Sequence, residues 1–458
     1  MTRREFVGMA CAGLAAPSRA AEHPPNFLII YADDLGIGDL GCYGARDVKT
    51  PHIDKLAAAG ARFTDWYTNS PVCSPSRASL LTGKYPQRTG VTEVLASTAQ
   101  FETRGLARGE ITLPGEFRKR GYRTGHIGKW HLGSAPESRP AVQGYDEFFG
   151  FYSGWADYYS HRYYRQGRVP QEIFHDLWRN EREEFRDGEY HTEMFGAEAA
   201  AFLSRQQSGT PFFLTAAFGA VHYPMMAPQK YLDRFSPQMD RERRMHAAVT
   251  AAMDDAVGLI VETLSRRGLL DNTVIFFQSD NGATNEIRAH SRAMPYRGGS
   301  NAPFRGFKAG LFEGGIRMPA VLAWTGRIPG NRSVSGVAGA MDIFPTFLNW
   351  AGVTQPYQVD GKNIAAMAQQ GAPSPHDAFF WGYLKQRAVR EGPWKLILNP
   401  PSVPGDPVES DVWLSNLAED PGEQVNLAKR EPERTARLQK RIEDWFAGFD
   451  SARSGVRA

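Results

Sequence analysis

Apolar residues along the chain fall into short runs separated by helical patterns. Three runs are continuously apolar, as in strands buried on both faces of a parallel sheet. A fourth, shorter run also has the pattern of a strand, and polar residues follow it as they follow the others. The runs span residues 26–32, 122–128, 211–218 and 273–279. Between them, residues 50–60 have the pattern of a capped helix, with Pro51 at the first helical position and Gly60 at the end, and apolar residues recur at helical spacing from Val249 to Leu264. This alternation predicts an α/β fold: a large mixed, mostly parallel sheet between layers of helices.

The C-terminal part shows a different pattern. Residues 371–375 combine glycine and proline in a manner typical of a boundary. Beyond them, residues 387–398 resemble a hairpin, and residues 433–446 form an amphipathic helical pattern. We therefore predict a main domain over residues 22–375 and a smaller subdomain over residues 376–458, with an antiparallel sheet and a helix.

The N-terminal residues 1–21 have the features of an export signal. Arg3 and Arg4 precede an apolar stretch that ends in small residues near Ala20, as in signals of the twin-arginine type. The apolar stretch is too short to anchor the mature protein in a bilayer. We expect an exported protein, periplasmic or extracellular, with a frayed basic terminus as the alternative interpretation.

Composition narrows the classes of partner. The 458 residues include 53 basic and 50 acidic side chains, for a formal net charge of +3, which does not favour nucleic acid as a partner. Without the predicted signal only Cys42 and Cys73 remain, too few for a disulfide framework. We expect Cys42 to be a small packing residue, and a Cys42–Cys73 disulfide stays open.

Cys73 opens the most distinctive motif, Cys-Ser-Pro-Ser-Arg, at residues 73–77. Ser74 can cap a helix whose first turn holds Pro75. A cysteine at such a helix start faces exposed backbone N–H groups, which lower a thiol pKa, and Arg77 adds positive charge one turn later. The alternative is an ordinary buried cysteine.

Polar residues follow the predicted strands, where ligand sites gather in open α/β sheets. Asp33 and Asp34 follow the first strand, and Asp280 and Asn281 follow the last. These are hard oxygen ligands that suit Ca²⁺ or Mg²⁺ better than zinc, although either pair alone is more often a turn or a helix cap. Three further residues stand close to strand ends: Lys129, His131 and His222. In an extended chain, Lys129 and His131 would point to the same side.

Together these motifs resemble the type I, formylglycine-dependent sulfatases, an arylsulfatase-like family of the alkaline phosphatase superfamily. The resemblance runs from about residue 26 to the C-terminal helix. It implies that Cys73 is converted to formylglycine by a maturation enzyme. It also implies one divalent cation, usually calcium, at a site made of residue 73 and the four strand-end residues, and a set of catalytic residues. The implied metal ligands are Asp33, Asp34, Cys73, Asp280 and Asn281, and the implied catalytic residues are Cys73, Arg77, Lys129, His131, His222 and Lys308.

The family mechanism implies a role for each of these groups. One hydroxyl of the hydrated aldehyde attacks sulfur while His222, with Lys308, assists the departing alcohol, and a sulfated enzyme intermediate results. His131 then takes the proton of the second hydroxyl, Lys129 supports the charge, and sulfate leaves.

Three features favour a sulfated carbohydrate as substrate: the habit of the family, the export signal and an aromatic segment over residues 145–162. That segment either walls the substrate pocket or simply packs on the main domain. Two other functions remain open, a phosphodiester or phosphonate monoester hydrolase of the same superfamily and an inactive sulfated-glycan-binding protein. The sequence predicts no oligomeric state.

Overall fold

The computed structural model describes residues 24–164, 172–207, 209–286, 296–354, 357–402 and 407–454. The predicted export signal over residues 1–21 lies outside the described residues. Among the described helices, none combines the length and the apolar character needed to cross a bilayer.

Within the described residues, the largest sheet has ten strands, in the order β13-β2-β12-β11-β1-β10-β4-β5-β8-β9. Its central strands β11, β1, β10, β4 and β5 are parallel, whereas β12, β2, β8 and β9 supply antiparallel pairings near the edges. The strands are β1 (Asn26–Ala32), β2 (Ala61–Phe63), β4 (Arg123–Lys129), β5 (Glu147–Phe151), β8 (Trp178–Arg179), β9 (Arg182–Glu183), β10 (Phe212–Ala217), β11 (Thr273–Ser279), β12 (Ala320–Ala323) and β13 (Arg332–Val334). The predicted mixed, mostly parallel sheet is confirmed.

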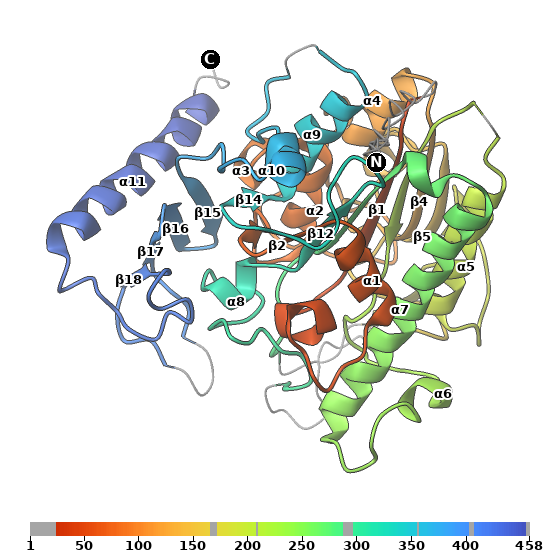
Figure 1. The fold of residues 1–458 in the computed structure, drawn as a ribbon, viewed down its shortest axis with the longest axis horizontal. Helices are drawn as coiled ribbons and strands as arrows, with labels where there is room; N and C mark the ends of the chain where they lie inside the picture. Colours follow the sequence, from red (N-terminus) through yellow and green to blue (C-terminus); the bar gives the residue numbers. More distant parts are fainter. Residues whose placement is uncertain are drawn as a thin grey trace, which may run out of the picture.

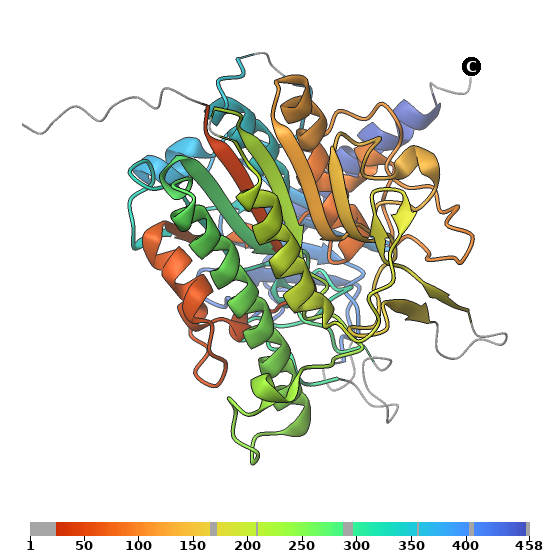
Figure 2. The same ribbon diagram turned by 90° about the vertical axis from the view of Figure 1, so that its right-hand side faces the viewer.

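Successive residues of β1 enter two different cores, which is why its sequence is continuously apolar. Leu28 and Ile30 pack in a core with three helices, α1 (Pro51–Ala59), α5 (His191–Ser204) and α7 (Arg241–Arg266). Phe27 and Ile29 pack on the opposite face with α2 (Cys73–Thr82), α4 (Leu113–Lys119) and α9 (Ile343–Trp350). Figure 2 shows α5 and α7 lying side by side across the first of these faces. The sheet is therefore buried between two helical layers.

A second sheet forms the predicted C-terminal subdomain. It has four antiparallel strands within the described residues, β15 (Phe379–Tyr383), β16 (Gln386–Glu391), β17 (Trp394–Leu398) and β18 (Val412–Asn416). Helix α11 (Pro432–Ser454) packs on β16 and β17 at one side of the molecule (Figure 1). The predicted hairpin corresponds to β16 and β17. The boundary at residue 375 remains a prediction.

The remaining elements are short. They are β3 (Trp66–Tyr67), β6 (Arg162–Tyr164), β7 (Ile173–His175), β14 (Ala338–Gly339), α3 (Pro86–Thr89), α6 (Gln229–Leu232), α8 (Glu313–Ile316) and α10 (Ala365–Gln370), with 3₁₀ turns at Ile37–Asp39, Gly41–Tyr43, Pro136–Ser138, Leu270–Asn272 and Ala340–Asp342.

A buried ionic cluster joins the C-terminal sheet to the main sheet domain. Lys395 of β17 lies 2.7 Å from Glu313 of α8 and 3.2 Å from Glu423, and all three side chains are buried. Glu423 also accepts a hydrogen bond from the backbone N–H of Glu313. Burial raises the pKa of Glu423 to about 7. Burial opposes the charge on Glu313 too, but Lys395, Arg317 and Arg390 outweigh it and lower its pKa to about 2.

These opposite shifts predict a pH dependence of stability. Glu423 has a folded pKa above its ordinary 4.5, so its contribution is present at low pH and is lost as pH rises from about 4.5 to about 7. The lowered pKa of Glu313 changes the free energy of unfolding only at pH values below about 4.5. We expect Glu423→Gln to flatten the fall of the free energy of unfolding between pH 5 and 7. Denaturant unfolding of both proteins across this range measures the slope, and equal slopes would contradict the assignment.

Candidate active site

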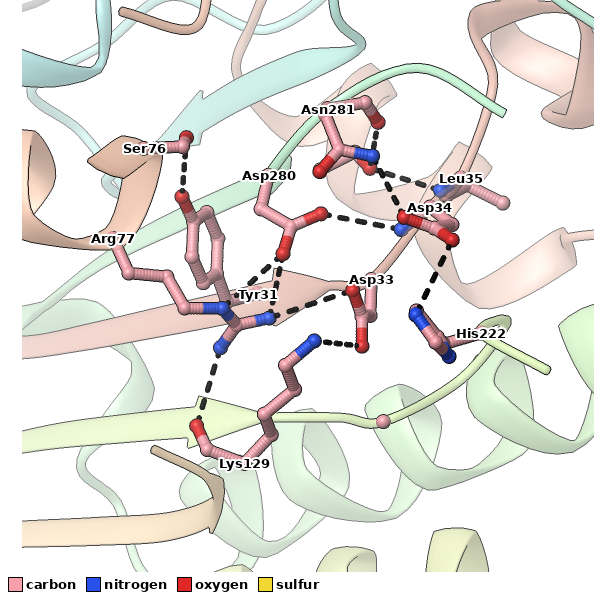
Figure 3. Close-up of polar contacts among 12 residues, drawn as sticks. Tyr31, Asp33, Asp34, Leu35, Ser76, Arg77, Lys129, His222, Asp280 and Asn281 are labelled. Atoms are coloured by element: carbon pink, nitrogen blue, oxygen red, sulfur yellow. Dashed lines mark hydrogen bonds and ion pairs between the residues drawn. The ribbon is translucent and has the colours of Figure 1, made fainter. Parts of the chain in front are cut away.

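The carboxyl ends of three central strands bring together side chains that are far apart in the sequence. Asp33 and Asp34 follow β1, Asp280 and Asn281 follow β11, and Lys129 is the last residue of β4. The backbone N–H of Asp280 donates to Ala32, and that of Asp33 donates to Ala220, which lies just beyond β10. The register of the parallel strands therefore fixes the backbone positions from which these side chains extend (Figure 3).

One half of the site is a buried set of two cations and two carboxylates. Lys129 Nζ lies 2.6 Å from Asp33 Oδ2, and neither side chain is exposed. Arg77 of α2 contacts Asp280 Oδ2 through Nη2 at 2.8 Å and through Nε at 3.1 Å, and donates to the backbone carbonyl of Lys129. The Arg77 guanidinium also lies over the Tyr31 ring, 4.9 Å from its centroid. Arg77 is thus held rigidly.

The other half centres on Asp34. Lys308 Nζ lies 2.8 Å from Asp34 Oδ1, and the Asn281 side-chain amide donates to the same oxygen. His222 Nε2 lies 3.7 Å from Asp34 Oδ2. Because His222 Nδ1 lies 2.6 Å from the backbone carbonyl of Tyr223, Nδ1 is the donor and Nε2 faces the site. Figure 3 shows His222 and the Asp34 carboxylate pointing toward one another.

The carboxylates differ in how easily they ionise. Burial raises the pKa of Asp33 well above its ordinary value, and the charge of Asp280 adds to this effect. Burial also raises the pKa of Asp34, although Lys308 opposes it. For Asp280, Arg77, Lys129 and Lys308 together outweigh burial and lower the pKa. Carboxylates crowded in this way are stabilised by further positive charge.

The predicted metal ligands fit a hard divalent cation. Two buried acceptor oxygens, Asp33 Oδ1 and Asn281 Oδ1, have no hydrogen-bond donor. Ligand atoms of Asp33, Cys73 and Asp280 lie within 4.8 Å of one another, as do those of Asp33, Asp34 and His222. Unsatisfied buried carboxylate and amide oxygens are the ligands that calcium prefers. The donor chemistry therefore fits Ca²⁺ or Mg²⁺, with Asp33, Asp34, Asp280, Asn281 and the residue at position 73 around it.

Two predictions about the local chemistry of Cys73 are wrong. The helix α2 begins at Cys73 itself, and its N-cap is Val72, not Ser74. Ser74 Oγ instead accepts a hydrogen bond from the backbone N–H of Leu95. The pKa of the Cys73 thiol is raised, not lowered, because burial outweighs the favourable charges of Lys129 and Lys308.

The two cysteines within the described residues, Cys42 and Cys73, are both free. Cys42 is partly buried and packs against the core that contains α1 and α7. It is therefore a packing residue, as the sequence suggests, and no disulfide occupies Cys73.

His131 has the form required of a base. Its Nε2 lies 3.1 Å from the Leu95 carbonyl and must be the donor, which leaves the lone pair on Nδ1. Nδ1 is buried without a hydrogen-bond partner. Burial and the charge of Lys129 hold the pKa of the imidazole well below its ordinary value, so the ring is neutral. The extended chain expected from Lys129 to His131 is wrong, because His131 has a φ of 54°.

The aromatic segment contributes a strand to the main sheet and also contacts the two histidines of the site. Its residues Glu147–Phe151 form strand β5. Beyond the strand, Gly154 lies so close to His131 that a Cβ there would be 2.8 Å from the imidazole Cε1. The Tyr158 hydroxyl donates to the backbone carbonyl of His222. No local sequence pattern predicts that Leu95, Gly154 or Tyr158 supports one of the two histidines.

Fold and site together define an enzyme built to hold a tetrahedral anion among buried cations at the carboxyl edge of a parallel sheet. The sequence model of the Sulfatase family matches residues 25–353, and that of the N-sulphoglucosamine sulphohydrolase C-terminal family matches residues 307–447. The chain therefore belongs to the type I sulfatase family of the alkaline phosphatase superfamily, and it is a sulfuric ester hydrolase.

Relatives and solved structures agree with this assignment. The chain is 35% identical over 373 residues to N-acetylgalactosamine-6-sulfatase of Homo sapiens, covering 79% of this chain and 69% of the relative. It is 33% identical over 490 residues to arylsulfatase A of Bos taurus, covering 96% and 90%. The crystal structure of Ps i-CgsB in complex with k-i-k-neocarrahexaose superposes with a TM-score of 0.81 at 28% identity, covering 92% of this chain and 93% of that chain.

Proposed function

We propose that this sulfatase removes sulfate from a monoester on a sulfated carbohydrate, and that its active form carries formylglycine at position 73. One observation carries the proposal. The Cys73 thiol lies with Asp33 and Asp280 in one buried cluster, where Lys129 and Lys308 influence its pKa. Because burial raises the pKa of an unmodified Cys73, the thiol is disfavoured as the nucleophile.

Two groups that the family implies would supply chemistry at this cluster. Hydrated formylglycine supplies an oxygen nucleophile with a second hydroxyl on the same carbon. A bound Ca²⁺ supplies charge opposite the sulfate oxygens. Arg77, Lys129 and Lys308 are already fixed by buried carboxylates and backbone carbonyls, so they can oppose negative charge without reorganising.

The two histidines have different partners and therefore different proposed roles. His131 Nδ1 holds a lone pair in a buried position. We propose that it accepts the proton of the second hydroxyl when sulfate is released. His222 Nε2 faces the site and lies 3.7 Å from Asp34 Oδ2. We assign His222, with Lys308, to the departing alcohol oxygen.

The carbohydrate substrate is inferred from relatives. The matched proteins include N-acetylgalactosamine-6-sulfatases, and Ps i-CgsB was crystallised with a neocarrahexaose. At the site, Trp155 packs at an edge-to-face angle on Tyr164 and lies beside Tyr223. Aromatic faces of this kind suit sugar rings.

Turnover of an aryl sulfate and of an aryl phosphodiester by the same preparation tests the proposal against the superfamily alternative. We expect the sulfate to react with the larger kcat/KM. A preference for the phosphodiester would overturn the sulfatase proposal, and binding of sulfated saccharides without any turnover would favour a glycan-binding role.

Calcium binding predicts a stability change that needs no substrate. A ligand that binds only the folded state at about 100 times its Kd stabilises it by about 2.7 kcal/mol. We expect Ca²⁺ to raise the Tm of chelator-treated wild type and to raise that of Asn281→Ala much less. Asp255→Asn is the matched control, because Asp255 belongs to a separate cluster with His52 and Asp254. Loss of the Ca²⁺ effect in the control alone would contradict the assigned site.

We also propose that residues 1–21 direct export through the twin-arginine route, so that position 73 is modified before the folded protein leaves the cytoplasm. Replacing Arg3 and Arg4 by Lys should retain the protein in the cytoplasm. Unchanged export of this variant would contradict the proposal.

A further inference from the structure

We propose that Gln386, in the C-terminal subdomain, is a positioning residue for Lys308: its side-chain amide holds the backbone that places the Lys308 ammonium in the active site. The inference rests on the proposed role of Lys308. It deepens that role by making the C-terminal sheet a structural part of the catalytic machinery.

The side chain of Gln386 makes two hydrogen bonds to the segment that follows Lys308. Gln386 is the first residue of β16 and is only 7% exposed. Its Nε2 donates to the backbone carbonyl of Ala309 at 2.8 Å, and its Oε1 accepts from the backbone N–H of Leu311 at 3.0 Å. Both the donor and the acceptor of this buried amide therefore bind the segment that follows Lys308.

The opposite side of the same segment is tied to the Cys73 region. The backbone N–H of Ala309 donates to the carbonyl of Pro71, two residues before Cys73, and that of Lys308 donates to Ala283. Ala309 itself has a φ of 69°. A residue with a Cβ is strained in this left-handed region, so its conformation needs support from both sides. Pro71 and Gln386 provide that support.

The hairpin that carries Gln386 reaches the active site. Tyr383 of β15 is paired with Gln386 across the tight turn between the strands. Burial raises the pKa of the Tyr383 phenol, and Cys73 and Lys308 both lie near enough to influence it. The end of the hairpin therefore lies within electrostatic reach of both residues.

A small displacement of this segment would act on catalysis through Lys308. The Lys308 ammonium contacts Asp34, and the backbone that carries it is held by Ala283 and, one residue later, by Pro71 and Gln386. Misplacing a catalytic group by about 1 Å can cost on the order of 100-fold in rate. Loss of both Gln386 hydrogen bonds removes the support on the Ala309 carbonyl.

The test compares Gln386→Met with Gln87→Met. Gln87 also ties the hairpin to the main domain, since its Nε2 donates to the backbone carbonyl of Gly382, but it has no contact with the Lys308 segment among its hydrogen bonds. We expect Gln386→Met to lower kcat for an aryl sulfate roughly 10- to 100-fold with a smaller change in KM. Gln87→Met should retain kcat within about threefold, the scale of a weak neutral hydrogen bond.

A double-mutant cycle separates positioning from general destabilisation. In a Lys308→Ala background, Gln386→Met should add little, because its effect passes through the missing ammonium. Hydrogen exchange supplies a readout independent of activity: the Leu311 amide should exchange faster in Gln386→Met than in Gln87→Met. Additive losses of kcat in the double mutant, or equal exchange rates of the Leu311 amide in Gln386→Met and Gln87→Met, would overturn the inference. An inactive wild type with the expected exchange difference would instead count against the proposed function alone.

Discussion

We expect His131→Ala to lower turnover of an aryl sulfate by about 10²–10⁴-fold, the range associated with loss of a general acid or base. The alcohol should still be released once, because the first half of the reaction uses His222 and Lys308. The experiment therefore measures pre-steady-state release: about one equivalent of phenol per active site, followed by near arrest. Normal turnover by His131→Ala, or the absence of any burst, would remove the proposed role.

A second histidine offers a matched control for this variant. His161 is also buried, has a φ of 53°, and its Nε2 donates to a backbone carbonyl, that of Glu189. Its Nδ1 likewise has no hydrogen-bond partner. His161→Ala thus removes a similar side chain from a similar setting outside the ion cluster. If both variants lost the same activity, the effect of His131→Ala would be structural.

The largest effect is expected from Cys73→Ala. Removal of a covalent nucleophile in serine hydrolases costs roughly 10⁶-fold in kcat, and we expect a loss of that order here. The replacement removes only one sulfur atom, so the fold should be retained although residue 73 is buried. Steady-state turnover and the far-UV spectrum check the two expectations together.

The matched control is Cys42→Ala, which removes the second free cysteine within the described residues. Cys42 packs against the core, and its backbone N–H donates to Asp54. This variant should keep wild-type turnover. Substantial activity in Cys73→Ala would show that position 73 does not carry the nucleophile.

The sequence predicts the main sheet well because its strands are locally distinctive. Residues 26–32 and 273–279 match β1 and β11 to the residue, since each is apolar on both faces. Helix boundaries are less well predicted. The α7 helix begins at Arg241, before the apolar stripe at Val249, because Asp240 caps it through the backbone N–H groups of Glu242 and Arg243.

The residue types of the candidate site could be read from the sequence, but their electrostatics could not. The prediction of a lowered thiol pKa considered only the helix start, whereas burial by distant segments decides the sign at Cys73. The extended conformation expected around His131 failed for a similar reason. Its left-handed backbone and its bond to Leu95 depend on a segment 36 residues away in the sequence.

Contacts made by the C-terminal subdomain are the least predictable part of the site. Gln386 lies 77 residues beyond Ala309, and no periodicity links the two positions. A glutamine at the start of a strand is ordinarily a solvated residue. Only the tertiary structure shows that its amide is buried against the Lys308 segment.

The proposed mechanism depends most directly on the chemical state of residue 73. Mass analysis of the peptide containing Cys73, from active protein made in its native host, measures that state. We expect the mass of an aldehyde or its hydrate in place of the thiol, in a fraction that rises with specific activity. A fully active preparation in which position 73 is an unmodified thiol would contradict it.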